Sequence, residues 1–154
     1  MMTKVFGVAL AAAAFSISVR AEQVPAQIVP VGEIPWPKDQ SQQLGSSQTP
    51  GLNTVMIVGD GETNRLYSIM FRVPPNARIA PHSHPDNRSC FVLTGLWRFA
   101  FGDRYDETKL LDLPPGSHYT EPGGRAHFAA TGPQGALVQC TAVGPTATTF
   151  VDEK

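Results

Sequence analysis

Residues 76–95 have the sequence NARIAPHSHPDNRSCFVLTG, in which His82 and His84 stand two apart at the end of an apolar run. Alternate side chains of a β-strand point to the same face, so the two imidazoles would project together. Neutral imidazole is a ligand for divalent Zn, Fe, Mn, Ni and Cu ions. A His-x-His pair alone is weak evidence for a metal site, so its surroundings have to decide.

The other two histidines, His118 and His127, also lie close together, in the segment GSHYTEPGGRAHF at residues 116–128. All four histidines of the chain thus occur in two short segments, which a random placement would not produce. This clustering favours a shared metal site.

The chain between and around these segments has the composition of an all-β domain. It contains 14 Gly and 14 Pro among 154 residues, and 42% of its residues are hydrophobic. Turn residues separate runs of four to nine residues, and no clean helical stripe occurs after the first twenty residues. A single helical turn is expected at YDETKL, residues 105–110. The predicted strands are residues 53–60, 65–73, 78–84, 89–95, 96–103, 109–113, 117–122, 126–132, 136–143 and 146–151.

The two histidine segments resemble the two motifs of the cupin superfamily. The first motif has a His-x-His pair, then Glu and Gly, and the chain offers His82, His84, Arg88 and Gly95 in that order. In the second motif, Gly, Pro-x-Gly, His and Asn follow at fixed spacing. At that spacing the chain has Gly116, Pro122, Gly124, His127 and Thr131. The likeness covers about residues 50–151.

This resemblance implies a double-stranded β-helix, the cupin or jelly-roll barrel, as a single domain. It also implies that His82, His84 and His127 bind one divalent transition metal inside the barrel, with Fe, Mn, Zn or Ni as candidates, and that the protein is a homodimer. Within the superfamily, the chain resembles a group of small exported bacterial cupins that carry Arg in place of the motif-1 Glu. The cupin domains of zinc-dependent anti-sigma factors are more distant relatives.

Arg88 changes the charge of such a site. At about 5 Å and an effective dielectric of about 20, a guanidinium would repel the metal by roughly 3 kcal/mol. An anion has to offset this repulsion, and the candidates are a substrate carboxylate, a phosphate, Asp86 or Glu121. Guanidinium suits bidentate carboxylate recognition, so Arg88 is a candidate catalytic residue that binds a small anionic ligand. The alternative is that Arg88 pairs with Asp86 at the barrel mouth.

His118 and the cysteines leave further alternatives open. His118, which shares a strand face with Thr120, is a candidate fourth metal ligand or general base, or else a barrel-lining histidine bonded to a neighbour. Cys90 and Cys140 are either a cross-strand disulfide or two buried thiols, and Cys90 could also serve as a soft metal ligand.

The first 21 residues predict export. Residues 1–21 have a positively charged start, an apolar Ala-rich run and small residues before Glu22, as in a secretory signal peptide cleaved after Ala21. Residues 22–50 are expected to form an extended arm and loop, with Trp36 as the anchor, and residues 51–154 the cupin domain. Without residues 1–21, ten basic and thirteen acidic residues give a net charge of −3. We therefore expect a periplasmic protein without a nucleic-acid partner, and without a membrane contact after signal cleavage.

Three functions are compatible with these residues. The first is a metal-dependent enzyme, of dioxygenase, isomerase or lyase type, acting on a small anionic compound. The second is a non-catalytic module that binds a metal or a small ligand, for example as a sensor. The third is a metal-free barrel in which Arg88 binds an anion directly.

Overall fold

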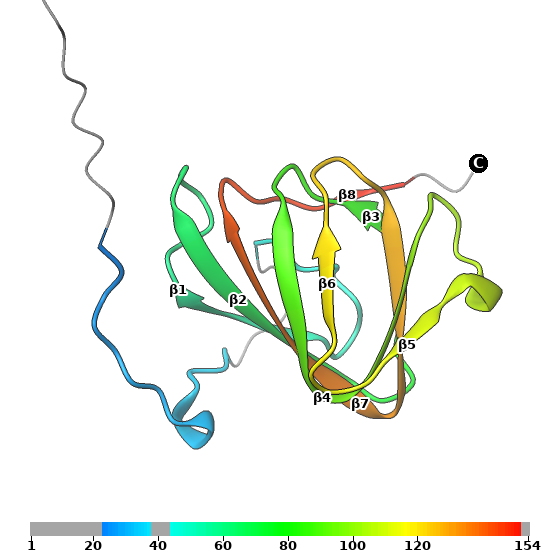
Figure 1. Cartoon of the computed structure of the whole chain (residues 1–154), viewed down its shortest axis with the longest axis horizontal. Coiled ribbons are helices and arrows are strands. Elements are labelled where there is room, and N and C mark those ends of the chain that lie inside the picture. Colours follow the sequence, from blue (N-terminus) through cyan, green and yellow to red (C-terminus); the bar gives the residue numbers. More distant parts are fainter. Residues whose placement is uncertain (1–22, 38–43, 152–154) are drawn as a thin grey trace, which may run out of the picture.

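Antiparallel strands make up most of the computed structural model, which describes residues 23–37 and 44–151 (Figure 1). The predicted signal peptide lies outside the described residues. Two short 3₁₀ helices occur: η1 at Val31–Glu33 and η2 at Glu107–Lys109, the second confirming the helical turn expected there. The strands are β1 Asn53–Val58, β2 Leu66–Val73, β3 Arg78–Ser83, β4 Arg88–Phe101, β5 Leu111–Leu113, β6 His118–Glu121, β7 His127–Val143 and β8 Thr149–Phe150. The all-β prediction is confirmed.

The long strands β4 and β7 connect all parts of the sheet. They pair with each other along most of their length, from Arg88 opposite Ala142 to Phe101 opposite His127. On their other edges β7 pairs with β2 and β3, whereas β4 pairs with β5 and β6. The strands thus surround an interior (Figure 1). Side chains from β2, β3, β4, β6 and β7 line it.

Each of these two strands was predicted as two separate runs, because glycines interrupt them. Gly95 in β4 and Gly135 in β7 have positive φ angles of 75° and 71°, and the β4–β7 register shifts next to Gly95. A Cβ atom on Gly95 would lie 2.1 Å from the Gly135 carbonyl oxygen, so only glycine permits this close approach. The glycines bend the strands without ending them.

The strands enclose a hydrophobic core, and the N-terminal arm contacts strand β2. Tyr67, Ile69, Val92 and Val138 are among the completely buried side chains of the main hydrophobic core. Trp36 of the arm lies under the guanidinium of Arg72, 4.0 Å from ring centroid to Cζ, in agreement with its expected role as an anchor. Within the described residues, no helix is long and apolar enough to cross a membrane.

Candidate metal centre

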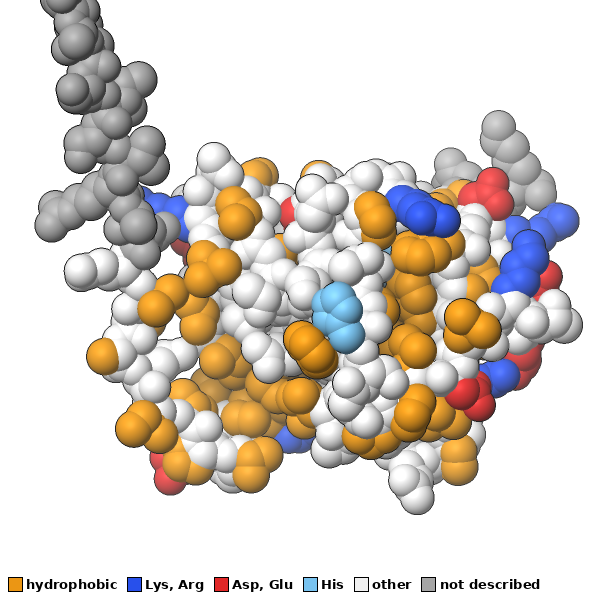
Figure 2. Space-filling view, viewed as in Figure 1, with side chains coloured by type: hydrophobic (Ala, Val, Ile, Leu, Met, Phe, Trp, Pro, Cys, Tyr) orange, Lys and Arg blue, Asp and Glu red, His pale blue; other side chains and the backbone are white. Residues whose placement is uncertain are grey.

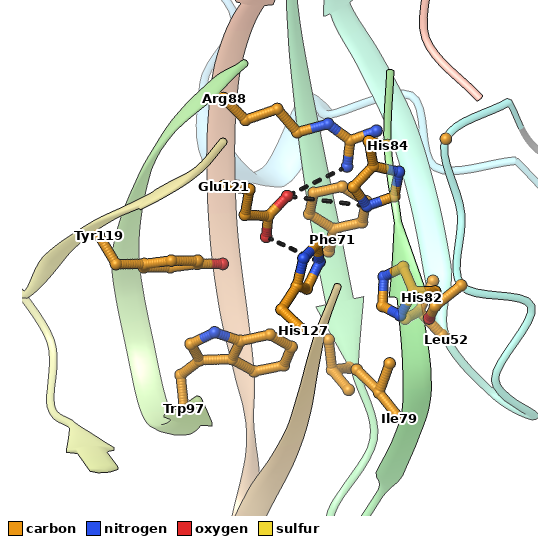
Figure 3. A pocket seen from close by; sticks show the side chains of 13 residues that line it. Leu52, Phe71, Ile79, His82, His84, Arg88, Trp97, Tyr119, Glu121 and His127 are labelled. Atoms are coloured by element: carbon orange, nitrogen blue, oxygen red, sulfur yellow. Dashed lines mark hydrogen bonds and ion pairs between the residues drawn. The ribbon is translucent and has the colours of Figure 1, made fainter. Parts of the chain in front are cut away.

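Three histidines meet inside the barrel (Figure 3). His82 lies on β3, His84 follows directly after it, and His127 begins β7 as the cross-strand partner of His82. All three are buried, and their ring centroids are 4.5 to 5.2 Å apart. One nitrogen of each imidazole lies within 4.8 Å of one nitrogen of each of the others. These three of the four histidines thus form a group that could hold a metal ion.

The backbone fixes the orientation of each imidazole. The Nδ1 atoms of His82 and His84 lie 2.7 Å from the carbonyl oxygens of Ala80 and Ala147. The Nδ1 of His127 lies 3.1 Å from the carbonyl oxygen of Arg125. A carbonyl oxygen only accepts, so each Nδ1 carries the proton and each Nε2 keeps its lone pair. This is the arrangement found behind metal-bound histidines.

Burial keeps the three imidazoles neutral. Removal from water lowers the pKa of His82 to about 4 and that of His84 to about 2. Desolvation likewise lowers the pKa of His127 to about 4, and the Nε2 atom of this residue is buried without a hydrogen-bond partner. A neutral imidazole with an unpaired Nε2 is ready to bind a metal ion at neutral pH, so the residues present fit such an ion.

Arg88 lies beside the histidines and is almost completely buried. Its Nε donates to Asp86 at 3.1 Å, Nη1 to Glu121 at 3.4 Å, and Nη2 to the Thr146 hydroxyl at 2.6 Å. The expected alternative, an Arg88–Asp86 pair, therefore forms, but inside the protein and together with a second carboxylate. The anions that offset the charge of Arg88 belong to the protein itself.

Tyr67 extends this network by one step. Its hydroxyl donates a hydrogen bond to Asp86 Oδ2, the atom that also accepts from Arg88. Desolvation raises the pKa of Tyr67 to about 12, so the tyrosine remains a proton donor. Asp86 is thereby held between Tyr67 and Arg88.

Glu121 was expected from the sequence only as a candidate anion beside Arg88, and the structure shows this pair and also places the carboxylate next to the histidines. It lies on β6, is 6% exposed, and faces the histidines with both carboxylate oxygens. Oε2 is 3.7 Å from His84 Nε2, and Oε1 is 3.8 Å from His127 Nε2. Strand alternation could have located it, because Glu121 shares a strand face with the aromatic Tyr119, which packs against the core.

His118 lies apart from the other three histidines. It is the only exposed one of the four, and Figure 2 shows an imidazole on the outer face of the sheet. Its Nε2 lies 3.0 Å from the Ser89 hydroxyl, and its ring centroid lies 4.8 Å from that of Phe91, with the two rings tilted by 51°. The expectation of an inward ligand or general base is therefore corrected, because His118 is on the face of β6 opposite to Glu121.

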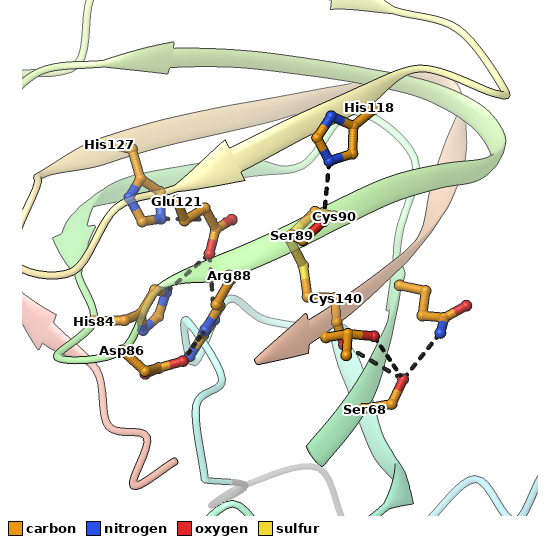
Figure 4. Close-up of a disulfide and its surroundings, with 12 residues drawn as sticks. Ser68, His84, Asp86, Arg88, Ser89, Cys90, His118, Glu121, His127 and Cys140 are labelled. Atoms are coloured by element: carbon orange, nitrogen blue, oxygen red, sulfur yellow. Dashed lines mark hydrogen bonds and ion pairs between the residues drawn. A yellow bond between two sulfur atoms is a disulfide. The ribbon is translucent and has the colours of Figure 1, made fainter. Parts of the chain in front are cut away.

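Cys90 and Cys140 form a disulfide between neighbouring strands (Figure 4). They are register partners on β4 and β7, with Cα atoms 4.1 Å apart, and neither is exposed. The structure thus selects the disulfide among the alternatives left open, and Cys90 is not a metal ligand in this form.

The space enclosed by the site is small. The cavity measures about 30 Å³, room for a metal ion and one or two waters. Trp97 and Tyr119 line one side of it, and Gly45 and Ser47 reach it from the segment before β1. The pocket is therefore polar around the histidines and is lined by apolar side chains on its other sides.

Comparison with protein families places this site in a known fold. The profile of the ChrR cupin-like domain matches residues 38–147. The chain belongs to the ChrR cupin-like family. Comparison with curated proteins finds no match.

Solved structures agree with this assignment. The polyketide cyclase RemF from Streptomyces resistomycificus is 21% identical over 84% of this chain and 89% of its own, with a TM-score of 0.61. The DMSP lyase DddQ from Ruegeria pomeroyi is 19% identical over 77% of this chain and 62% of its own, with a TM-score of 0.58. An RmlC-like cupin from Shewanella frigidimarina is 16% identical over 79% of this chain and 94% of its own, with a TM-score of 0.56. The predicted cupin fold is confirmed, whereas function does not follow from likeness at this level.

Proposed function

We propose that this cupin binds one divalent transition-metal ion through His82, His84 and His127 and uses it to act on a small anionic organic compound. One observation carries the proposal. The three Nε2 lone pairs point into one buried pocket while every Nδ1 is tied to a backbone carbonyl. The Nε2 of His127 is buried without a hydrogen-bond partner, and a metal ion bound by the three histidines would satisfy it.

The charge of the site supports an anionic substrate. The described groups are three neutral imidazoles, the cation Arg88, and the carboxylates Asp86 and Glu121, which together carry a net charge of −1. A divalent ion changes this total to +1. A carboxylate or enolate bound next to the ion would neutralise the remaining charge in a pocket with little water.

The reaction class proposed is that of a dioxygenase, isomerase or lyase. When bound, a metal ion supplies Lewis-acid polarisation of an oxygen-containing ligand. Two similar structures are named as a polyketide cyclase and a DMSP lyase, which act on small molecules. In this chain, Arg88 would keep positive charge near the substrate and hold Glu121, while Trp97 and Tyr119 exclude water.

A second function is favoured by the size of the cavity. About 30 Å³ holds an ion and one or two waters but no organic acid, unless the segment containing Gly45 and Ser47 moves. A site this small suits a non-catalytic role in which the barrel binds a metal or a small ligand for sensing. Binding without turnover would identify this alternative.

Export to the periplasm is part of the proposal. Residues 1–21 have the features of a signal peptide, and a disulfide between Cys90 and Cys140 is compatible with an oxidising compartment. We expect the mature chain to begin at Glu22, which the mass of the protein recovered from a periplasmic fraction would test. A homodimer, expected from the cupin resemblance, would be tested by light scattering of the same sample.

The first experiment is the metal content of the mature protein, purified without a histidine tag, beside a His84→Ala control. About one Fe, Mn, Zn or Ni per chain, lost in the control, would support the proposal and indicate which reactions to assay. Less than about a tenth of an equivalent, even after incubation with these metals, would contradict it. Small carboxylates would then be tested by titration calorimetry and by product analysis, which separate turnover from binding.

A further inference from the structure

We infer that Glu121 is the fourth protein ligand of the metal and that Arg88 holds it in position. This inference rests on the three-histidine site proposed above and adds a residue to it. The first cupin motif would place a glutamate where this chain has Arg88, and the structure supplies a carboxylate from a different strand.

The two residues are neighbours across one rung of the sheet. Arg88 on β4 and Glu121 on β6 are register partners, and directly opposite residues of antiparallel strands have adjacent side chains. A carboxylate at position 121 therefore enters nearly the same space as one at position 88. Compared with the first cupin motif, the acidic group of this chain is therefore on the neighbouring strand β6, and a cation occupies the motif position on β4.

The distances around Glu121 fit two ligands of one ion. Its oxygens lie 3.7 Å from His84 Nε2 and 3.8 Å from His127 Nε2, too far for hydrogen bonds. Two ligand atoms about 2.1 Å from a tetrahedral ion are separated by about 3.4 Å. The ligand atoms that all lie within 4.8 Å of one another belong to the three histidines, so the Glu121 carboxylate would have to move toward the ion to coordinate it.

A cation would satisfy the polarity of these contacts. With the proton of each imidazole on Nδ1, the Nε2 atoms of His84 and His127 are hydrogen-bond acceptors, and so are the carboxylate oxygens that face them. While Glu121 is ionised, acceptors that face each other in a buried pocket are unfavourable, because no proton lies between them. A metal ion in the common centre turns these contacts into bonds.

Arg88 is a positioning residue in this arrangement. Asp86 and Thr146 hold its Nε and Nη2, and Tyr67 holds Asp86, so Nη1 has a fixed direction toward Glu121 Oε2. Figure 3 shows the carboxylate between the guanidinium on one side and the imidazoles of His84 and His127 on the other. The guanidinium thus orients the carboxylate and stabilises its charge.

The test uses zinc and cobalt as probes. We would measure Zn²⁺ affinity by competition with a chromophoric chelator, and the visible spectrum of the Co²⁺-loaded protein, for the native chain, Glu121→Gln and Glu107→Gln. Glu107 is the control because its carboxylate is exposed and pairs with Arg98. Removal of a ligand should weaken Zn²⁺ binding about 10- to 100-fold or more and change the Co²⁺ spectrum, whereas the control should match the native chain.

The exchange variant Arg88→Glu/Glu121→Arg tests the strand swap directly. It returns the acidic group to the position of the first cupin motif, so we expect tighter Zn²⁺ binding than in Glu121→Gln. Failure of this variant to fold would leave the single variant and the native crystal structure as the test. In a crystal of the native protein with Zn²⁺, a Glu121 oxygen should lie about 2.0 to 2.2 Å from the ion.

The outcomes separate this inference from the proposed function. Unchanged affinity and spectrum in Glu121→Gln, or a water between the ion and Glu121 in the crystal, would overturn the role of Glu121 and leave the three-histidine site intact. Absence of metal binding by the native chain would overturn both.

Discussion

Arg88 and Glu121 stand opposite each other on β4 and β6, and the guanidinium Nη1 lies 3.4 Å from the carboxylate Oε2. Both side chains are almost completely buried. Arg88 also binds Asp86 at 3.1 Å, so a single cation serves two carboxylates. Desolvation raises the pKa of Glu121, and the charge of Arg88 opposes this rise. The cost of burying these groups is thus offset only while all three remain together.

Replacement of Arg88 by Met should therefore destabilise the protein strongly. Asp86 and Glu121 would lose their cation inside the barrel, and breaking a buried pair in this way costs about 3–5 kcal/mol. Urea unfolding of the metal-free protein would measure the loss. Arg98→Met is the control, because Arg98 pairs with two exposed carboxylates and should cost about 1 kcal/mol or less. Equal effects of the two variants would contradict this prediction.

The contribution of His82 and His127 to the stability of the metal-free protein should rise with pH between about 4 and 6.5, whereas the raised pKa of Glu121 acts in the opposite direction. In the unfolded chain a histidine has a pKa of about 6.5. Burial lowers the pKa of His82 and His127 to about 4. Between these values the unfolded chain binds protons that the folded chain does not, so acid favours unfolding. Above about pH 6.5 this contribution is complete and levels off.

Urea titrations at several pH values, on protein prepared without metal, would show this slope. His82→Gln should reduce it, because one of the buried imidazoles is then missing. A variant with the same pH dependence as the native chain would refute the assignment of the slope to His82. His118→Gln is the matched control, since His118 is exposed.

Metal binding should stabilise the native chain by linkage. At a free Zn²⁺ concentration 100 times the dissociation constant, the free energy of unfolding should increase by about 2.7 kcal/mol. A chelator should remove the gain, and His84→Ala should not show it. His118→Ala should show the full gain, because His118 bonds Ser89 on the outer face. A lost gain in His118→Ala would mean that this residue reaches the metal after all.

The sequence was sufficient to predict the cupin fold and the grouping of three histidines inside the barrel. His82 and His84 share a face through strand alternation, and the second motif adds His127 at its fixed spacing. The predicted strand boundaries at Gly95 and Gly135 were wrong, because glycine occurs both in turns and at bends within a continuous strand. Only the contact between the two backbones, which depends on the tertiary structure, shows that the strands continue.

The partners of Arg88 and the inward direction of Glu121 were harder to predict. Local sequence offered Asp86, two residues away, but Glu121 becomes a neighbour only through the pairing of β4 with β6. The face of β6 was ambiguous, because a histidine and a glutamate on opposite faces are both plausible site residues. The aromatic Tyr119, on the face of Glu121, resolves this ambiguity once it is assigned to the interior.

The Cys90–Cys140 disulfide should contribute strongly to stability. The two residues are 50 positions apart, and closing a loop of that length stabilises a fold by about 4 kcal/mol in the chain-entropy description. Alkylation of the unfolded, unreduced protein should label no thiol, since these are the only cysteines in the chain. The Cys90→Ala/Cys140→Ala variant should unfold at lower urea than the native chain, with a difference that disappears when the native disulfide is reduced. Labelling of both cysteines without a reductant would show that the bond does not form in solution.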